Sequence, residues 1–178
     1  IVSAMMNAFM AYSEGRAVIP PVAEMSFSSP PGDVHIKYGS LEGGSHYVVK
    51  IASGFYNNPQ WGLPSSQGLM LLFDQHTGQL AAVLLDEGKL TDLRTGAAGA
   101  VAAHALANKD IKGIGIIGTG IQARSQLAQL SQVTPCRNVY AWGRSADRLH
   151  AYVEDARNMG FVVRTVSGPE EVAAHASL

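Results

Sequence analysis

Residues 111–124 read Ile-Lys-Gly-Ile-Gly-Ile-Ile-Gly-Thr-Gly-Ile-Gln-Ala-Arg, and this stretch decides the fold. An apolar run leads into closely spaced glycines, which is typical of a strand that turns directly into a helix. Gly118, Gly120 and Ala123 fit the G-x-G-x-x-G/A fingerprint of dinucleotide-binding sites: Gly118 suits a tight turn, Gly120 lets the backbone approach a pyrophosphate, and Ala123 allows close helix packing. The free N–H groups that begin the helix would bind phosphates. The expected cofactor contacts are Gly118, Thr119, Gly120, Ile121, Gln122 and Ala123.

The residues that follow continue the alternation of strands and helices. The pattern predicts strands over 113–117, 138–142 and 161–165, and helices over about 120–133, over 146–159 and from Pro169. Alternating strands and helices with short connections indicate an α/β fold with a parallel sheet. We therefore predict that residues 109–178 form the N-terminal half of an NAD(P)-binding Rossmann domain, truncated before its remaining strands.

The end of the second predicted strand favours NADP(H) over NAD(H). It reads Trp142-Gly143-Arg144-Ser145 and lacks the Asp or Glu that usually binds the ribose hydroxyls of NAD. Arg144 can stack on adenine and, with Ser145, bind a 2′-phosphate. Gly143, Arg144 and Ser145 are therefore further candidate cofactor contacts. The alternative is that Arg144 is a solvated residue after a strand.

The first half of the chain has a different pattern. Apolar residues at helical spacing predict a helix over 2–14, which Gly15 would end. Short β-rich runs follow, separated by proline- and glycine-rich segments, at 34–38, 47–52, 69–74 and 79–86. Residues 75–78 suit a tight hairpin connection. We predict an α+β domain with an antiparallel sheet over residues 1–108.

A helix built from very small residues is predicted between the two halves. It runs from Leu93 to Ala107, and Thr91-Asp92 is placed to cap it. Each glycine inside a helix costs about 1 kcal/mol relative to alanine. The two glycines in this helix therefore indicate that another element approaches it closely.

Composition excludes several classes of protein. The 178 residues carry a formal net charge of −1 and show no basic stripe, so we expect no nucleic-acid partner. No apolar run is long enough to span a membrane, and no membrane partner is expected. The single cysteine, Cys136, cannot form an internal disulfide, which suits a cytoplasmic protein. The histidines show no ligand spacing, so no metal site is expected.

Two basic residues stand among apolar or very small neighbours. Lys50 lies within Tyr-Val-Val-Lys-Ile-Ala, and a desolvated ammonium requires an anionic partner or a functional role. The alternative is a lysine on an edge strand whose head group reaches water. Arg94 begins the small-residue helix, and its alternatives are an ordinary exposed residue or an ion pair with Asp86 or Asp92.

At these residues the sequence resembles the ornithine cyclodeaminase and mu-crystallin family. Four segments carry the resemblance in order: Tyr-Val-Val-Lys-Ile-Ala-Ser-Gly-Phe-Tyr-Asn-Asn-Pro from Tyr47, Gly-Leu-Met-Leu-Leu-Phe-Asp from Gly68, Leu-Thr-Asp-Leu-Arg-Thr-Gly-Ala-Ala-Gly-Ala from Leu90, and Ile-Ile-Gly-Thr-Gly-Ile-Gln-Ala from Ile116. They extend over nearly the whole chain.

The resemblance implies roles for residues and domains. Lys50 and Arg94 are expected to bind a substrate carboxylate, with Lys50 near the reacting carbon as a proton donor or a water-orienting group; an ammonium and a forked guanidinium together suit a carboxylate. The first domain is expected to form a homodimer through its antiparallel sheet. The active site is expected in a cleft between the two domains.

Two departures from the family pattern affect this assignment. Family members often carry an arginine shortly after the proline pair, whereas Val22-Ala23-Glu24 follows Pro20-Pro21 here. The third basic contact is therefore missing, or His35 or Lys37 replaces it. The catalytic aspartate of the family lies beyond the position of Leu178, so we expect a fragment without its general acid/base and with poor activity.

Three functions follow from the shared chemistry of hydride transfer at an α-carbon. The first is an imine reductase or amino-acid dehydrogenase that turns over NAD(P)H. The second is a cyclodeaminase, which oxidises a diamino acid, loses ammonia and returns the hydride. The third is a crystallin-like protein that binds NADPH and a small ligand without catalysis. The arginine-serine pair at 144–145 favours the first, and the substrate is an amino-acid or imine carboxylate.

Overall fold

A computed structural model describes residues 1–178, and the chain forms two compact units. One unit comprises residues 1–6 and 92–178, and the other comprises residues 7–91. The helices α1 (Val2–Ser13) and α2 (Lys89–Leu106) each contribute residues to both units. The contacts therefore place most of α2 with the parallel sheet, whereas we expected the domain boundary near residue 108. The assignment of roles to residues 1–108 and 109–178 stays a prediction.

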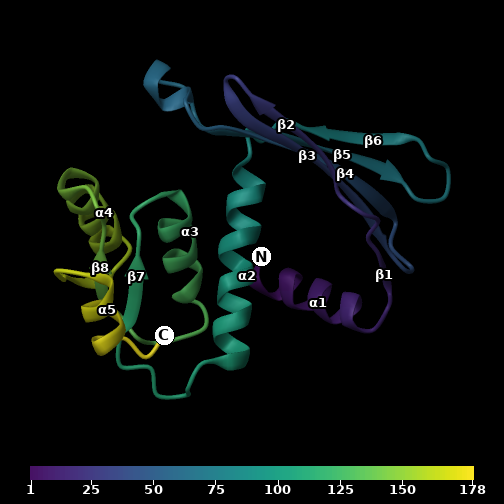
Figure 1. Cartoon of the computed structure of the whole chain (residues 1–178). Coiled ribbons are helices and arrows are strands. Elements are labelled where there is room, and N and C mark those ends of the chain that lie inside the picture. Colours follow the sequence, from purple (N-terminus) through teal and green to yellow (C-terminus); the bar gives the residue numbers. More distant parts are fainter. The chain divides into compact units, whose positions relative to one another are not determined.

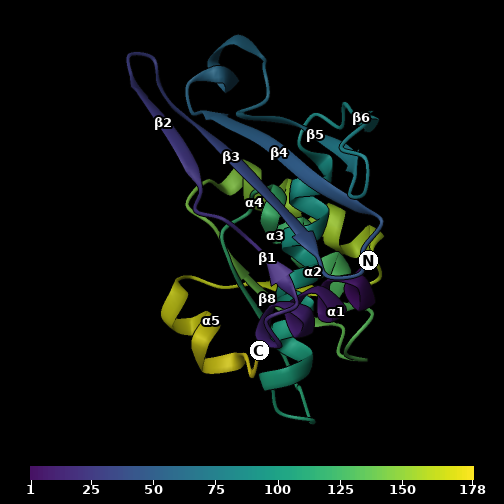
Figure 2. The same cartoon turned by 90° about the vertical axis from the view of Figure 1, so that its right-hand side faces the viewer.

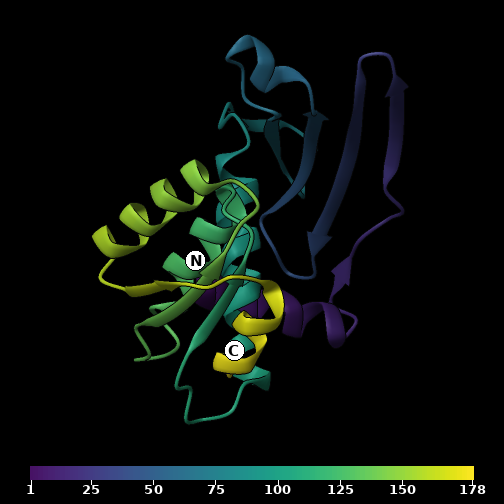
Figure 3. The same ribbon diagram turned by 60° about the vertical axis from the view of Figure 1, so that its left-hand side comes forward.

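The unit of residues 7–91 contains a six-stranded antiparallel sheet (Figure 1). Its strands are β1 (Ala17–Val18), β2 (Ala23–Ser28), β3 (Pro31–Leu41), β4 (His46–Phe55), β5 (Ser66–Asp74) and β6 (Leu80–Leu84). The order is β1-β3-β4-β5-β6, and β2 pairs with another part of β3. Figures 2 and 3 show the long β2–β3 hairpin from two sides. A short 3₁₀ helix, η1 (Asn58–Trp61), connects β4 to β5.

The strand register gives this sheet two different faces. Because side chains alternate along a strand, cross-strand partners share a face. One face is largely apolar from β2 to β6, with Ala23, Met25, Phe27, Val34, Ile36, Tyr38, Tyr47, Val49, Ile51, Leu69, Leu71, Phe73 and Val83. Ser40, Ser53 and Gln67 lie on the same face near its ends. None of the apolar side chains except Val34 is fully buried within the chain. The opposite face carries the charged residues, among them Lys37 directly opposite Lys50.

The sheet is antiparallel, as the sequence predicted, and it contains one more long strand than the sequence predicted. The hairpin at 75–78 forms as expected, with Gly78 at φ 72° and the Asp74 carboxylate accepting from the backbone N–H groups of His76 and Thr77 at 2.9 and 2.8 Å. Strand β2 was not predicted. Its six residues are all exposed, but Ala23, Met25 and Phe27 alternate with polar residues, so the sequence did carry a strand signal there.

The start of α2 also differs from the prediction. The helix begins at Lys89, two residues before the expected cap at Thr91. The Asp86 carboxylate accepts a hydrogen bond of 2.7 Å from the backbone N–H of Leu90 in the first turn. Asp86 therefore satisfies a free N–H group of the helix start, the role that we had assigned to Thr91-Asp92.

The second unit contains a three-stranded parallel sheet in the order β7-β8-β9, which confirms the predicted Rossmann-type alternation. Its elements are β7 (Ile114–Ile117), α3 (Ile121–Leu130), β8 (Asn138–Trp142), α4 (Ala146–Asn158), β9 (Val162–Thr165) and α5 (Pro169–His175). After α5 the chain reaches the free edge of β7, where Gly115 N–H donates to the Leu178 carbonyl at 2.6 Å and Ser177 N–H donates to the Gly113 carbonyl at 2.9 Å. This edge therefore receives a further extended segment.

The small residues of α2 allow α3 to approach, as the sequence predicted. A Cβ at Gly96 would lie 2.7 Å from the backbone oxygen of Ser125, and one at Gly99 would lie 2.7 Å from the side-chain oxygen of Gln126. On its other side α3 packs against β7 through Leu127, which is fully buried with Ile114 (Figure 1). Helix α3, which follows the glycine loop, is thus held between α2 and the sheet.

Candidate functional site

The glycine loop adopts a backbone conformation that fits its predicted role. It follows β7, and Gly118 has φ 104°, which side chains other than glycine rarely allow. Gly120 precedes the first turn of α3, and no side chain caps that helix. A Cβ at Gly118 or Gly120 would point into open space. The first N–H groups of α3 therefore face an accessible region, as phosphate binding at a helix N-terminus requires.

The loop and the end of β8 line one pocket of about 370 Å³. Its lining residues are Ile117, Gly118, Thr119, Gly120, Trp142, Gly143, Arg144, Ser145 and Arg148. Gly143 allows the two segments to meet, because a Cβ there would lie 2.7 Å from the Thr119 methyl group. The structure thus brings two separately predicted groups of candidate cofactor contacts together at the carboxyl ends of neighbouring parallel strands, the usual ligand position in such sheets.

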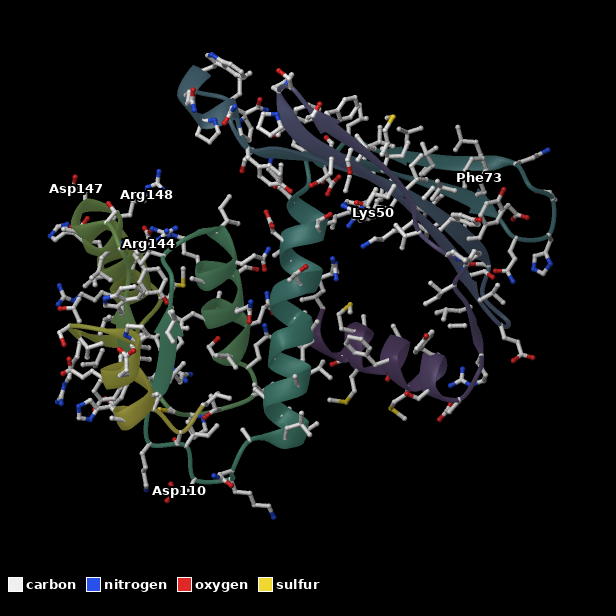
Figure 4. The ribbon with its side chains drawn as sticks, viewed as in Figure 1. Lys50, Phe73, Asp110, Arg144, Asp147 and Arg148 are labelled. Atoms are coloured by element: carbon white, nitrogen blue, oxygen red, sulfur yellow. The ribbon has the colours of Figure 1, made fainter.

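Arg144 and Arg148 give this pocket a positive rim (Figure 4). Arg148 lies in the first turn of α4, and the Ser145 hydroxyl accepts from its backbone N–H at 3.4 Å. Ser145 therefore caps α4, while its hydroxyl hydrogen can still be donated to an anion. Sequence analysis missed Arg148. The signal available in the sequence was its position: Arg148 follows Arg144 by four residues, and Ser145 between them is a typical residue to cap the helix that begins there.

Two side chains of α3 hold the loop in place. The Arg124 guanidinium donates to the carbonyls of Thr119 and Gly120 at 2.5 and 3.3 Å, and to the Asp155 carboxylate on α4 at 2.6 Å. The Gln122 amide donates to the Asp92 carboxylate at 2.6 Å. The Gln122 side chain is thus engaged with α2, and its predicted cofactor contact rests on its backbone. These bonds position the turn through which a dinucleotide would be held.

Lys50 lines a second cavity, of about 360 Å³, which lies wholly within the unit of residues 7–91. Its wall consists of Ala8, Ala17, Ile19, Lys37, Tyr38, Gly39, Ser40, Leu41, His46, Val48 and Lys50. Figure 4 labels Lys50 on β4. Strand β4 contributes the alternate residues His46, Val48 and Lys50, which share the charged face of the sheet with Lys37, and the end of β3 contributes consecutive residues from 37 to 41. The cavity combines apolar surface with two ammonium groups and contains no acidic residue.

The other two predicted substrate contacts do not line this cavity. His35 lies beside Asp33, with 3.3 Å between its Nε2 and the Asp33 Oδ1. Tyr56 donates a hydrogen bond to the same carboxylate, and this bond raises the pKa of Tyr56. Arg94 is exposed on α2 in the other unit and takes part in none of the ion pairs of the structure. Of the two alternatives to a functional role, the ion pair of Arg94 with Asp86 or Asp92 is therefore not formed, and the ordinary exposed residue stays open.

Comparison with known proteins assigns the chain. A sequence profile of the ornithine cyclodeaminase/mu-crystallin family matches residues 1–178, the whole chain. The chain belongs to this family. Among relatives, the uncharacterized cyclodeaminase y4tK of Sinorhizobium fredii is 37% identical over 174 residues, which cover 97% of this chain and 53% of that protein.

Solved structures of the family share the fold. The Δ1-pyrroline-2-carboxylate reductase of Thermococcus litoralis, in complex with NADH and L-proline, matches with a TM-score of 0.92 at 30% identity, over 99% of this chain and 55% of that one. An archaeal alanine dehydrogenase dimer with bound NAD matches with a TM-score of 0.87 at 31% identity, over 96% and 52%. The chain spans about half the length of the family members it matches. None of its helices combines the length and apolar composition that a membrane span requires.

Proposed function

We propose that the protein is an NAD(P)-dependent oxidoreductase that acts by hydride transfer at the α-carbon of an amino acid or of its imine. The observation that carries this proposal is the pocket shared by the glycine loop and the end of β8, at the uncapped start of α3. Both solved relatives described above bind a nicotinamide cofactor and are an imine reductase and an amino-acid dehydrogenase by name.

The residues of this pocket fit a dinucleotide. The loop from Gly118 to Gly120 and the first N–H groups of α3 would hold the pyrophosphate. Arg144, Arg148 and Ser145 offer two guanidinium groups and a hydroxyl, with no carboxylate in the lining, so we propose a preference for NADP(H) over NAD(H). A bound nicotinamide supplies or accepts the hydride.

Lys50 and Arg94 are the proposed contacts of the substrate carboxylate. Lys50 presents an ammonium in a partly apolar cavity, where a charge-assisted hydrogen bond to a carboxylate is stronger than in water. It is also the proposed proton donor or water-orienting group beside the reacting carbon. His35 stays a proposed substrate contact, with its Nε2 atom 3.3 Å from the Asp33 carboxylate.

Cofactor oxidation tests this function. The natural full-length protein is incubated with NADPH or NADH and a panel of cyclic imine carboxylates, and absorbance is followed. We expect net oxidation, faster with NADPH, and a loss of at least tenfold in kcat/KM in both Lys50→Ala and Arg94→Ala, because each removes a charged contact to the carboxylate. Retained activity in both variants would remove these two residues from the proposal.

A cyclodeaminase is the second candidate, favoured by the 37% identity to the relative of that name. This reaction returns the hydride to the intermediate and releases ammonia, so it shows no net cofactor oxidation. Ammonia release from ornithine without NADPH consumption would support it. Cofactor binding without either reaction would instead indicate a crystallin-like binding protein.

We also propose that the protein is a cytoplasmic homodimer. The apolar face of the antiparallel sheet is continuous over five strands and is not fully buried within the chain, which is typical of a surface that another protein chain covers. The related alanine dehydrogenase is a dimer. The free Cys136 suits a reducing compartment.

A further inference from the structure

Two lysines stand directly opposite each other on the charged face of the antiparallel sheet. Lys37 on β3 is the cross-strand partner of Lys50 on β4, so both side chains leave the same face from neighbouring positions. Both also line the cavity of about 360 Å³. Like charges placed directly opposite destabilise a strand pair. Their presence together therefore requires an explanation.

At Lys37, the protein's own carboxylates do not supply it. No acidic residue lines the cavity, and Lys37 takes part in none of the ion pairs of the structure. The nearest acid along the same face of β3 is Asp33, whose two oxygens contact His35 and Tyr56. Glu24 stands opposite His35, at another level of the sheet. An anion from outside would offset the repulsion at Lys37.

We propose that Lys37 binds a second carboxylate of the substrate, so that the natural substrate is a dicarboxylic amino acid or its imine. This inference rests on the proposed function, in which Lys50 binds the first carboxylate. The rest of the cavity wall is largely apolar, with Val48, Leu41 and Ile19, and suits the short carbon chain between two carboxylates. The volume is that of a site for a small metabolite.

A comparison of mono- and dicarboxylates distinguishes this role of Lys37 from a contact to one carboxylate that it shares with Lys50. If both ammonium groups bound one carboxylate, mono- and dicarboxylates would be held alike. If each bound its own, a monocarboxylate would make no charge-assisted hydrogen bond to Lys37, and the site would hold it less tightly than a dicarboxylate. The difference is measurable with redox-inert probes.

The test is calorimetric titration of the natural full-length protein, in the presence of NADP⁺, with succinate and with propionate. We expect succinate to bind at least about tenfold more tightly, since a charge-assisted hydrogen bond contributes about that factor or more. In Lys37→Gln the ratio of the two affinities should fall to near one, and Lys37→Arg should restore most of it. Lys112→Gln removes an exposed lysine outside the cavity and should leave the ratio unchanged.

The outcomes separate this inference from the function on which it rests. Equal binding of succinate and propionate by the wild type would overturn the second carboxylate, as would a ratio that Lys37→Gln leaves unchanged. Turnover of monocarboxylate imines would then still support the oxidoreductase. Tight, Lys37-dependent succinate binding without NAD(P)H oxidation by any imine would instead contradict the oxidoreductase and retain the dicarboxylate site.

Discussion

At the residue scale, Arg148 is the position whose contribution to the cofactor pocket can be tested most cleanly. It lies in the first turn of α4 beside Arg144, and both line the pocket. In Arg148→Ala we expect the preference for NADPH over NADH to fall by about tenfold, because a guanidinium contact to the 2′-phosphate is lost while contacts common to both cofactors remain. Fluorescence titration with each cofactor measures the ratio.

The matched control for this change is Arg157→Ala, which removes an exposed arginine from the last turn of the same helix. It should leave the ratio of the two affinities unchanged. NADH binding as tight as NADPH binding in the wild type would contradict the proposed preference outright.

Tyr152 offers a second residue-scale prediction, on stability. Its side chain is fully buried, its hydroxyl has no hydrogen-bond partner, and burial raises the pKa of that hydroxyl. Tyr152→Phe removes an unsatisfied polar group and keeps the ring under the Arg124 guanidinium, 5.3 Å from the ring centroid. We expect the free energy of unfolding to stay unchanged or to rise by up to about 1 kcal/mol in denaturant titration.

Replacement by alanine at the same position calibrates that measurement. Tyr152→Ala should cost about 3–5 kcal/mol, as for other large aromatic residues removed from a core. A comparable loss in Tyr152→Phe would mean that the hydroxyl has a partner after all.

At the element scale, α2 contains two glycines whose replacement by alanine should have opposite effects on the free energy of unfolding. In Gly96→Ala the new Cβ meets the backbone of Ser125, which cannot move without shifting α3, so we expect a loss of about 1–3 kcal/mol in the free energy of unfolding. In Gly99→Ala it meets only the end of the Gln126 side chain, which can turn away. There the gain in helix propensity, about 1 kcal/mol, should cancel or exceed the cost.

Thermal and denaturant unfolding of the two variants measure the contrast directly. Equal effects would show that α2 and α3 are not in the close contact described. The two variants should also differ in cofactor binding. Because α3 begins at the glycine loop, Gly96→Ala should weaken NADPH binding, and Gly99→Ala should not.

Sequence predicted elements well where backbone chemistry fixes the residue type. The glycine loop, the hairpin at Gly78 and the small-residue helix were all predicted from positions that demand a positive φ or a close approach. It missed β2, although Ala23, Met25 and Phe27 alternate with polar residues there, and it misplaced the start of α2. There the cap is formed by Asp86, which lies outside the helix and is not distinguished by local spacing.

In the candidate site, too, features formed by residues close together in the chain were predicted better than features formed by distant residues. The cofactor pocket is lined by two short segments that the sequence identified, but Ile117, Trp142 and Arg148 were not predicted to line it, and the predicted contacts Ile121, Gln122 and Ala123 are not in its wall. The cavity around Lys50 joins residues far apart in the chain through strand register, which sequence alone does not fix. Lys37 could be named as a candidate from the sequence, but its position opposite Lys50 could not.

At the scale of the whole molecule, the apolar sheet face predicts dimerisation. Ile36 lies on this face with part of its surface exposed. In Ile36→Lys we expect the natural full-length protein to shift from dimer to monomer at micromolar concentration, because a charge would be buried in an apolar interface. Leu106→Lys changes a more exposed apolar residue outside that face and should leave the dimer intact. Sedimentation velocity reports both, and a monomeric wild type would contradict the proposal.

The most direct test of the central claim follows the hydride itself. The full-length protein is supplied with NADPH deuterated at the transferred position of the nicotinamide and with a cyclic imine carboxylate, and the product is examined by NMR. The account predicts one deuterium at the α-carbon of the amino-acid product, with stoichiometric oxidation of the cofactor. Product without deuterium at that carbon, or no cofactor oxidation with any imine tested, would contradict it.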